Sequence, residues 1–135
     1  MGIRLATEKD LPVLCLHDKH VDKQELENLI RLNRVYLAEQ EDRFVGWLRY
    51  NLFWDNTPFM NMIYLLEESR GKGVGRQFVE YWENAMKMLG YEVVMTSTAS
   101  DEYAQHFYGK LGYQVVGGFL PEGDPFELIL SKRLS

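Results

Sequence analysis

The chain has 135 residues, of which 46% are hydrophobic and 26% charged, and its formal net charge is −5. Because this is the length of one compact domain, we expect a single domain over 1–135. The acidic charge and the scattered basic residues argue against a nucleic-acid partner. No apolar run is long enough to cross a bilayer, so we expect a cytoplasmic protein that is not bound to a membrane.

Capping signals and apolar periodicity predict the elements in chain order. Thr7 with Asp10, and Asp22 with Glu25, have capping-box spacing and predict two helices. Three aliphatic and aromatic runs then indicate a β-meander, and a long amphipathic helix follows that ends at Gly90. The expected strands are Ile3–Ala6, Val35–Glu39, Arg43–Phe53, Phe59–Leu66, Glu92–Thr98, Tyr113–Val116 and Phe126–Leu130, and the expected helices are Thr7–His17, one from Asp22, Val74–Leu89 and Asp101–Leu111.

This order of elements, β-α-α-β-β-β-α-β-α-β-β, predicts an α/β fold in which helices cover a mixed sheet. We expect Asp101 and Glu102 in the first turn of the fourth helix, where acidic residues favour the positive end of the helix dipole. Trp47, Trp54 and Trp82 are expected in the core more readily than in a cage around a ligand.

The sequence from 70 to 76 runs from a strand into the longest helix and has the composition of a phosphate-binding turn. Its alternate glycines let a phosphate approach the first helical amides, which have no partner inside the helix. The helix dipole adds about half a positive charge at that end, and three side chains add full charges. The glycines are Gly71, Gly73 and Gly75, and the cations are Arg70, Lys72 and Arg76.

Two common phosphate-binding turns do not fit this spacing. In a P-loop the lysine precedes Ser or Thr, whereas Lys72 precedes Gly73. A dinucleotide-binding turn needs a third glycine, at the place of either Arg76 or Phe78.

Arg70, Gly73 and Gly75 stand at the spacing of the acyl-CoA signature of the GNAT acetyltransferase superfamily, which this turn resembles. The segment from Ala104 to Tyr113, with Tyr108 in a Phe-Tyr pair, resembles the second motif of that family. The motifs occur in the family's order, and the elements match it from residue 3 to about 134. The resemblance implies a GNAT-like, mostly antiparallel sheet of about seven strands flanked by four helices, and an acetyl-CoA-dependent N-acetyltransferase.

The resemblance also implies how coenzyme A would bind. The strand before the turn would separate from the strand at 92–98, and the main chain of Leu65 and Leu66 would pair with the pantetheine arm in the resulting slot. The amides from Gly71 to Arg76, including Lys72 and Val74, would hold the pyrophosphate. Asp101 stands where the family often has an asparagine that touches the pantetheine.

Tyr108 matches the tyrosine to which the family assigns protonation of the leaving thiolate. An ordinary tyrosine has a pKa near 10, so this side chain would be protonated at neutral pH and could act as a general acid. An amide on the Leu65 strand would polarise the thioester carbonyl. No metal is expected, because the only cysteine, Cys15, excludes a metal site built on cysteines, and the three histidines lack metal-ligand spacing with carboxylates.

The general base is not assigned, because the strand before the turn, where many relatives have a glutamate, reads Met60-Asn61-Met62. Asp55, Tyr64, His106, a water chain or an acceptor of low pKa remain open. Glu67 and Glu68 are expected to face solvent.

The acceptor is expected to be a primary amine of a small molecule or a peptide. The turn from 53 to 59 and the helices before Asn33, which the family places around the substrate, are the candidate acceptor contacts. In the turn, Trp54 and Asp55 could together hold a cation. A CoA-binding module of the same fold without catalysis, and a partner-binding domain, remain alternatives. The sequence also leaves open a homodimer and the transfer of another short acyl group.

Overall fold

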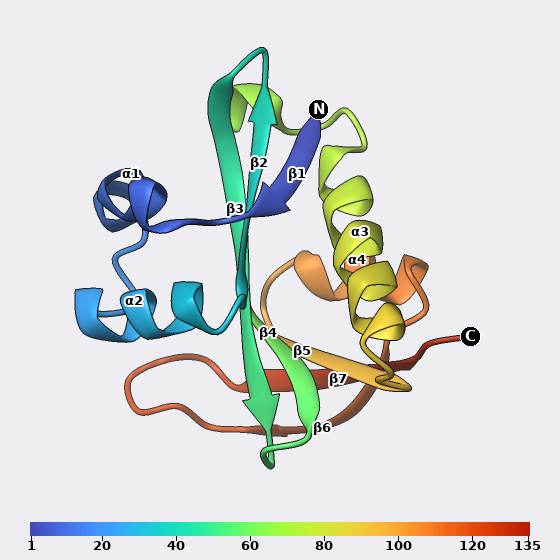
Figure 1. The fold of residues 1–135 in the computed structure, drawn as a ribbon. Coiled ribbons are helices and arrows are strands. Elements are labelled where there is room, and N and C mark those ends of the chain that lie inside the picture. The colour runs from blue at the N-terminus through green and yellow to red at the C-terminus, as the bar shows by residue number, and fades with distance from the viewer. The chain divides into compact units, whose positions relative to one another are not determined.

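The computed structural model describes all 135 residues, Met1–Ser135. Seven strands form one mixed, mostly antiparallel sheet, as the fold class predicted, and their order is β1-β2-β3-β4-β5-β7-β6. The β4–β5 pair is parallel, whereas β1–β2, β2–β3, β5–β7 and β6–β7 are antiparallel. The elements in Figure 1 are β1 (Gly2–Leu5), η1 (Glu8–Asp10), α1 (Leu11–His17), α2 (Lys23–Arg31), β2 (Val35–Gln40), β3 (Arg43–Phe53), β4 (Thr57–Leu65), η2 (Glu67–Ser69), α3 (Val74–Met88), β5 (Val93–Ala99), α4 (Ala104–Lys110), β6 (Gln114–Phe119) and β7 (Glu127–Arg133).

The chain divides into two compact units. The first consists of Met1–Asn51 and Met62–Tyr81, and the second of Leu52–Asn61 and Trp82–Ser135. The chain passes between them within β3, β4 and α3. A single domain over 1–135 stays a prediction.

The core of the first unit lies between its helices and strands. In Figure 1, α1 and α2 lie next to each other on one side of β2 and β3. The Asp22 carboxylate accepts a hydrogen bond from the Glu25 amide (2.8 Å), which confirms the predicted cap of α2. The buried apolar side chains of this cluster are Ala6, Leu14, Leu26, Leu29, Ile30, Val35, Leu37 and Trp47.

The predicted capping box at Thr7 and Asp10 is present, but it opens the 3-10 helix η1 and not an α-helix. The α-helix α1 begins only at Leu11, with Pro12 in its first turn. Proline fits that position because the first turn of an α-helix needs no amide donor.

Two strands of the second unit are longer than predicted. Strand β7 pairs with β5 along its whole length, from Val93 opposite Arg133 to Ala99 opposite Glu127. The polar residues at the end of β7 do not predict a strand from sequence. They are extended because they pair with β5. Strand β6 likewise continues to Phe119 through its pairing with β7.

The predicted start of α4 at Asp101 is wrong. The amide of Glu102 donates to the carbonyl of Ala99 (3.1 Å), so these residues form a turn, and the helix begins at Ala104. Asp101 therefore lies in the turn before the helix and not within its first turn.

Two of the three tryptophans follow the core prediction and one does not. Trp47 and Trp82 are buried, but Trp54 is 81% exposed at the turn between β3 and β4. The strands flanking Trp54 reverse there, so its side chain projects beyond both. No helix of the structure combines the length and the apolar character needed to cross a bilayer.

Candidate active site

In the turn between β4 and α3, two of the three glycines adopt a backbone conformation that few other residues adopt. Gly71 has a φ of 79° and Gly73 a φ of 75°, in the left-handed region that favours glycine. A Cβ atom added at either position would meet no atom within 4 Å. These glycines are therefore required by backbone conformation, and their outer face is open.

The start of α3 leaves a set of amides unpaired. The amide of Gln77 donates to the carbonyl of Gly73 (3.1 Å), which is the first bond of the helix. The amides from Gly73 to Arg76 therefore have no partner inside α3. Four adjacent donors at the positive end of a 15-residue helix form a site that suits an anion.

The three cations around this turn differ in their contacts. The Nε atom of Arg70 donates to the carbonyl of Leu65 (2.8 Å), and its guanidinium carbon lies 4.9 Å from the ring centroid of Tyr64. The exposed Arg76 pairs with Glu80 (2.9 Å). Lys72 makes no such contact, so its charge is available to an anion.

The end of β4 is held by the protein's own main chain. The amide of Leu66 donates to the carbonyl of Val45 (2.8 Å), and the carbonyl of Leu66 accepts from the amide of Ser69 (2.9 Å). Both main-chain groups of Leu66 thus have partners within the chain.

Gly46 on β3, which the sequence did not single out, lies against the same strand end. A Cβ atom at this position would clash with the carbonyl oxygen of Tyr64 and lie 2.8 Å from the Leu65 Cδ2 atom. Sequence pattern could not reveal this need, because it arises from the close approach of β4 to β3.

In the second unit, Tyr108 is a buried residue of α4. Burial, together with the charge of Glu102, raises the pKa of Tyr108 to about 12, although a hydrogen bond with Thr96 opposes the shift. The hydroxyl of Thr96 donates to the carbonyl of Met60 (3.0 Å). Tyr108 therefore keeps its proton at every ordinary working pH.

A buried polar network lies beside Tyr108. The ring of Tyr113 packs edge-on at 5.5 Å from that of Tyr108, and the Tyr113 hydroxyl donates to Glu83 (2.7 Å). Lys132 donates to the other oxygen of Glu83 (2.9 Å). Burial and the Glu83 charge raise the pKa of Tyr113. The network fixes Tyr113 and so supports the ring of Tyr108.

The β3–β4 turn exposes the two candidate acceptor residues. Trp54 and Asp55 have φ values of 53° and 65°, and the amide of Asn56 donates to the carbonyl of Phe53 (3.2 Å). The rings of Phe53 and Trp54 stack at 5.6 Å. Residues other than glycine rarely adopt this backbone conformation. Here it places an aromatic surface beside a carboxylate.

The predicted site residues fall in both units. Leu65, Leu66 and residues 70–76 belong to the first, and Trp54, Asp55, Asp101 and Tyr108 to the second. Of the side chains left open as the base, Tyr64 packs against Trp47 at 5.0 Å, and exposed His106 lies 5.1 Å from Tyr103. Glu67 and Glu68 are exposed, as expected.

Comparison with known proteins decides the family. The model described as "Acetyltransferase (GNAT) family" matches residues 6–113. The chain belongs to the GNAT acetyltransferase family. The resemblance found in its two motifs is thereby confirmed, and the family is one of acetyltransferases.

Solved structures support the GNAT fold along the whole chain. Ribosomal-protein-alanine N-acetyltransferase from Brucella melitensis is 23% identical, with a TM-score of 0.82 over 99% of this chain and 100% of that one. PaiA N-acetyltransferase from Thermoplasma acidophilum, solved with coenzyme A, is 19% identical, with a TM-score of 0.78 over 98% of each chain. Aminoglycoside 6'-acetyltransferase type Ii is 20% identical, with a TM-score of 0.78 over 100% of this chain and 98% of that one. Comparison with curated protein sequences gives no match.

Proposed function

We propose that this GNAT protein transfers an acetyl group from acetyl-CoA to a primary amine of a small molecule or a peptide. The observation that carries the proposal is the turn from Gly71 to Arg76, where unpaired amides, open glycines and cations meet at the start of α3. These features fit a pyrophosphate, which needs several donors and a positive field. The coenzyme A in the PaiA structure supports the same ligand.

In this proposal the amides from Gly71 to Arg76 hold the pyrophosphate, with Lys72 as the free counter-charge. Leu65 is the main candidate for main-chain pairing with the pantetheine, because both main-chain groups of Leu66 bond within the chain. The carbonyl of Leu65 already accepts from Arg70, so the side chain of Arg70 would rearrange if that carbonyl is needed. Asp101 is retained as a candidate pantetheine contact.

Tyr108 is the proposed general acid. With a pKa of about 12 it is a weaker acid than a thiol, whose pKa is about 8.5, so complete proton transfer to the thiolate is uphill. Tyr108 would therefore act mainly by donating a hydrogen bond to the sulfur as negative charge develops there.

The acceptor class follows from the names of structural neighbours and from the β3–β4 turn. One neighbour is named for a ribosomal-protein alanine and another for an aminoglycoside, which supports both peptide and small-molecule amines. Trp54 and Asp55 would hold the cationic form of the amine before it loses its proton. Cytoplasmic location, a homodimer and independence from nucleic acids and membranes stay predictions.

A CoA-binding protein without catalysis is the second candidate. It is favoured by one observation: residues 60–62 of β4 contain no carboxylate that could serve as the base.

One assay separates the two candidates. Purified protein is mixed with acetyl-CoA and a panel of amines, including peptides with different N-terminal residues, and free thiol is measured over time. In parallel, thermal unfolding is measured with CoA, ATP and NAD, because a ligand at 100 times its Kd adds about 2.7 kcal/mol of stability. Thiol release with one amine class supports acetyl transfer. Stabilisation by CoA without thiol release supports the second candidate. The absence of both thiol release and stabilisation would overturn both candidates.

A further inference from the structure

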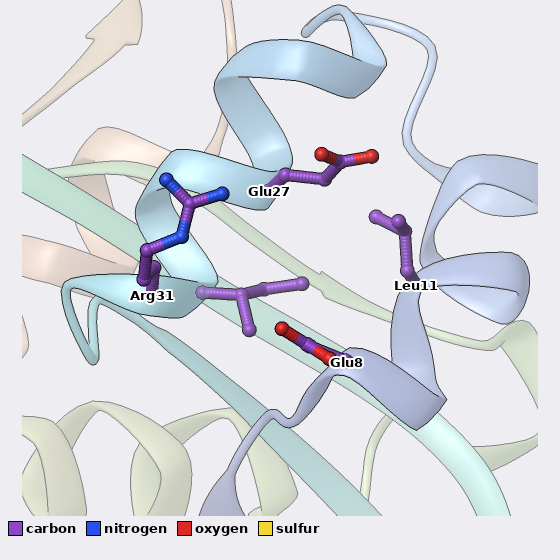
Figure 2. A pocket seen from close by; sticks show the side chains of 5 residues that line it. Glu8, Leu11, Glu27 and Arg31 are labelled. Carbon is purple, nitrogen blue, oxygen red and sulfur yellow. The ribbon is translucent and has the colours of Figure 1, made fainter.

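A hollow of about 300 Å³ lies between the segment that contains η1 and α1 on one side and α2 on the other. Figure 2 shows its lining. Ile30 is buried at 6% exposure and belongs to the core of the first unit, and Leu11 adds a second apolar side chain. Three charged side chains complete the lining: Glu8, Glu27 and Arg31.

The charged side chains of this hollow have no ion-pair partners. Glu27 and Arg31 are four residues apart on α2, which is the favourable spacing for a helical ion pair, yet they form none. On α3 the same spacing gives the Arg76–Glu80 pair at 2.9 Å. The guanidinium of Arg31 instead donates to the side-chain oxygen of Asn28 (3.2 Å).

Figure 2 shows how these groups are directed. The Glu27 carboxylate and the Arg31 guanidinium extend away from each other, and the carboxylate of Glu8 faces them from the opposite wall. Negative and positive groups therefore occupy different parts of the lining.

The walls are fixed before any ligand arrives. Asp10 in η1 accepts two bonds from the guanidinium of Arg4 (2.8 and 2.9 Å) and one from the amide of Thr7 (2.7 Å), which holds the segment that carries Glu8. The Asp22 cap holds the start of α2. A site whose walls are held in this way loses little conformational entropy on binding.

From this arrangement we infer that the hollow binds a free α-amino acid with an aliphatic side chain. The α-ammonium group bonds to Glu8 and Glu27, the α-carboxylate bonds to Arg31, and the side chain covers Leu11 and Ile30. Each pairing is a charge-assisted hydrogen bond to a side chain that has no ion-pair partner in the free protein. The volume is at the small end of the range for small-molecule sites, which suits a ligand of this size.

The same arrangement disfavours other ligand classes. Two carboxylates repel phosphates and dicarboxylates, and a simple alkylamine would leave Arg31 without a partner. The site is separate in sequence from the CoA-binding turn, and the inference does not depend on the proposed reaction.

Isothermal titration calorimetry of the intact protein with leucine tests the inference. Leucinamide lacks the carboxylate and 4-methylpentanoate lacks the amine, so each should bind at least about tenfold more weakly than leucine. Failure of leucine to bind at about 10 mM, or equal binding of all three compounds, would overturn the inference.

Two substitutions assign the binding to this hollow. Arg31→Gln should weaken the binding of leucine by about tenfold or more and leave the binding of leucinamide unchanged. Glu27→Gln should weaken the binding of leucine and leave the binding of 4-methylpentanoate unchanged. Lys23→Gln and Glu25→Gln are the matched controls, because both lie on α2 outside the hollow and should bind leucine as the wild type does. If leucine binds equally well to Arg31→Gln and Glu27→Gln, it binds elsewhere and the inference is wrong.

Discussion

The Nε atom of Arg49 lies 2.7 Å from the carboxylate of Asp18, and the two residues are only 7% and 3% exposed. The indole of Trp47 donates to the same carboxylate (3.0 Å). This buried pair ties the end of α1 to the middle of β3. Burial alone would raise the pKa of Asp18, but the hydrogen bonds and charge of Arg49 hold it below its ordinary value.

Asp18→Asn should lower the free energy of unfolding at pH 7 by about 3–5 kcal/mol, because it leaves the charge of Arg49 buried without a counter-ion. The Asp18 contribution is fully present above the unfolded pKa, near 3.9, and is lost as pH falls through the lower folded pKa. The deficit should therefore shrink in denaturant unfolding below about pH 4. Asp42→Asn, in an exposed turn, is the control, and a deficit that does not change with pH would contradict the ion-pair explanation.

Gly73→Glu should abolish CoA binding by placing bulk and negative charge beside the free amides of α3. Gly123→Glu is a matched control, because Gly123 also has a positive φ (80°) and open space around its Cβ position. Both changes strain the backbone by about 1–2 kcal/mol. Calorimetry should thus show similar losses of stability but a loss of CoA affinity in Gly73→Glu alone, and retained affinity there would remove the proposed site.

Tyr108→Phe should lower kcat by about 10²-fold or more and leave the Kd of CoA nearly unchanged, because it removes a donor used in the transition state. Tyr103→Phe, at an exposed tyrosine before α4, is the control. Since burial raises the pKa of Tyr108 to about 12, the wild-type rate should show no alkaline decline from this group up to about pH 10. An undiminished kcat in Tyr108→Phe would exclude Tyr108 as the acid.

Gly46→Ala should destabilise the protein by about 1–3 kcal/mol, because the added methyl group would clash with the carbonyl of Tyr64. It should also weaken CoA binding, since relief of the clash displaces Leu65. Gly117→Ala is the control: Gly117 also lies in a strand, but its Cβ position is open. Thermal unfolding and CoA titration of both variants measure these effects, and identical results for the two would show that the close approach has no consequence.

Asp55→Asn should raise the KM of a cationic acceptor and leave the Kd of CoA unchanged, if the β3–β4 turn holds the amine. Asp42→Asn removes a charge from a turn with the same positive φ (62°), so it controls for backbone effects. Asparagine tolerates this conformation in both turns. An unchanged KM in steady-state assays of Asp55→Asn would remove this turn from the acceptor site.

Local sequence determined the order of elements and the place of the glycine-rich turn before α3. The bounds of β3 were predicted as they stand, and those of α3 to within one residue, because both elements carry long uninterrupted hydrophobic patterns. The turn from 70 to 76 could be read because its glycines and cations are consecutive in the chain. Where a local structure depends on neighbours in sequence, spacing alone was sufficient to predict it.

Long-range packing decided the features that the sequence did not reveal. The polar end of β7 is a strand because β5 pairs with it, and Trp54 is exposed because two strands reverse beside it. Gly46 matters because β4 approaches it, and Asp18 finds Arg49 across 31 positions of sequence. No local sequence pattern predicts these contacts, because in each of them the fold brings two distant segments to within a few ångströms.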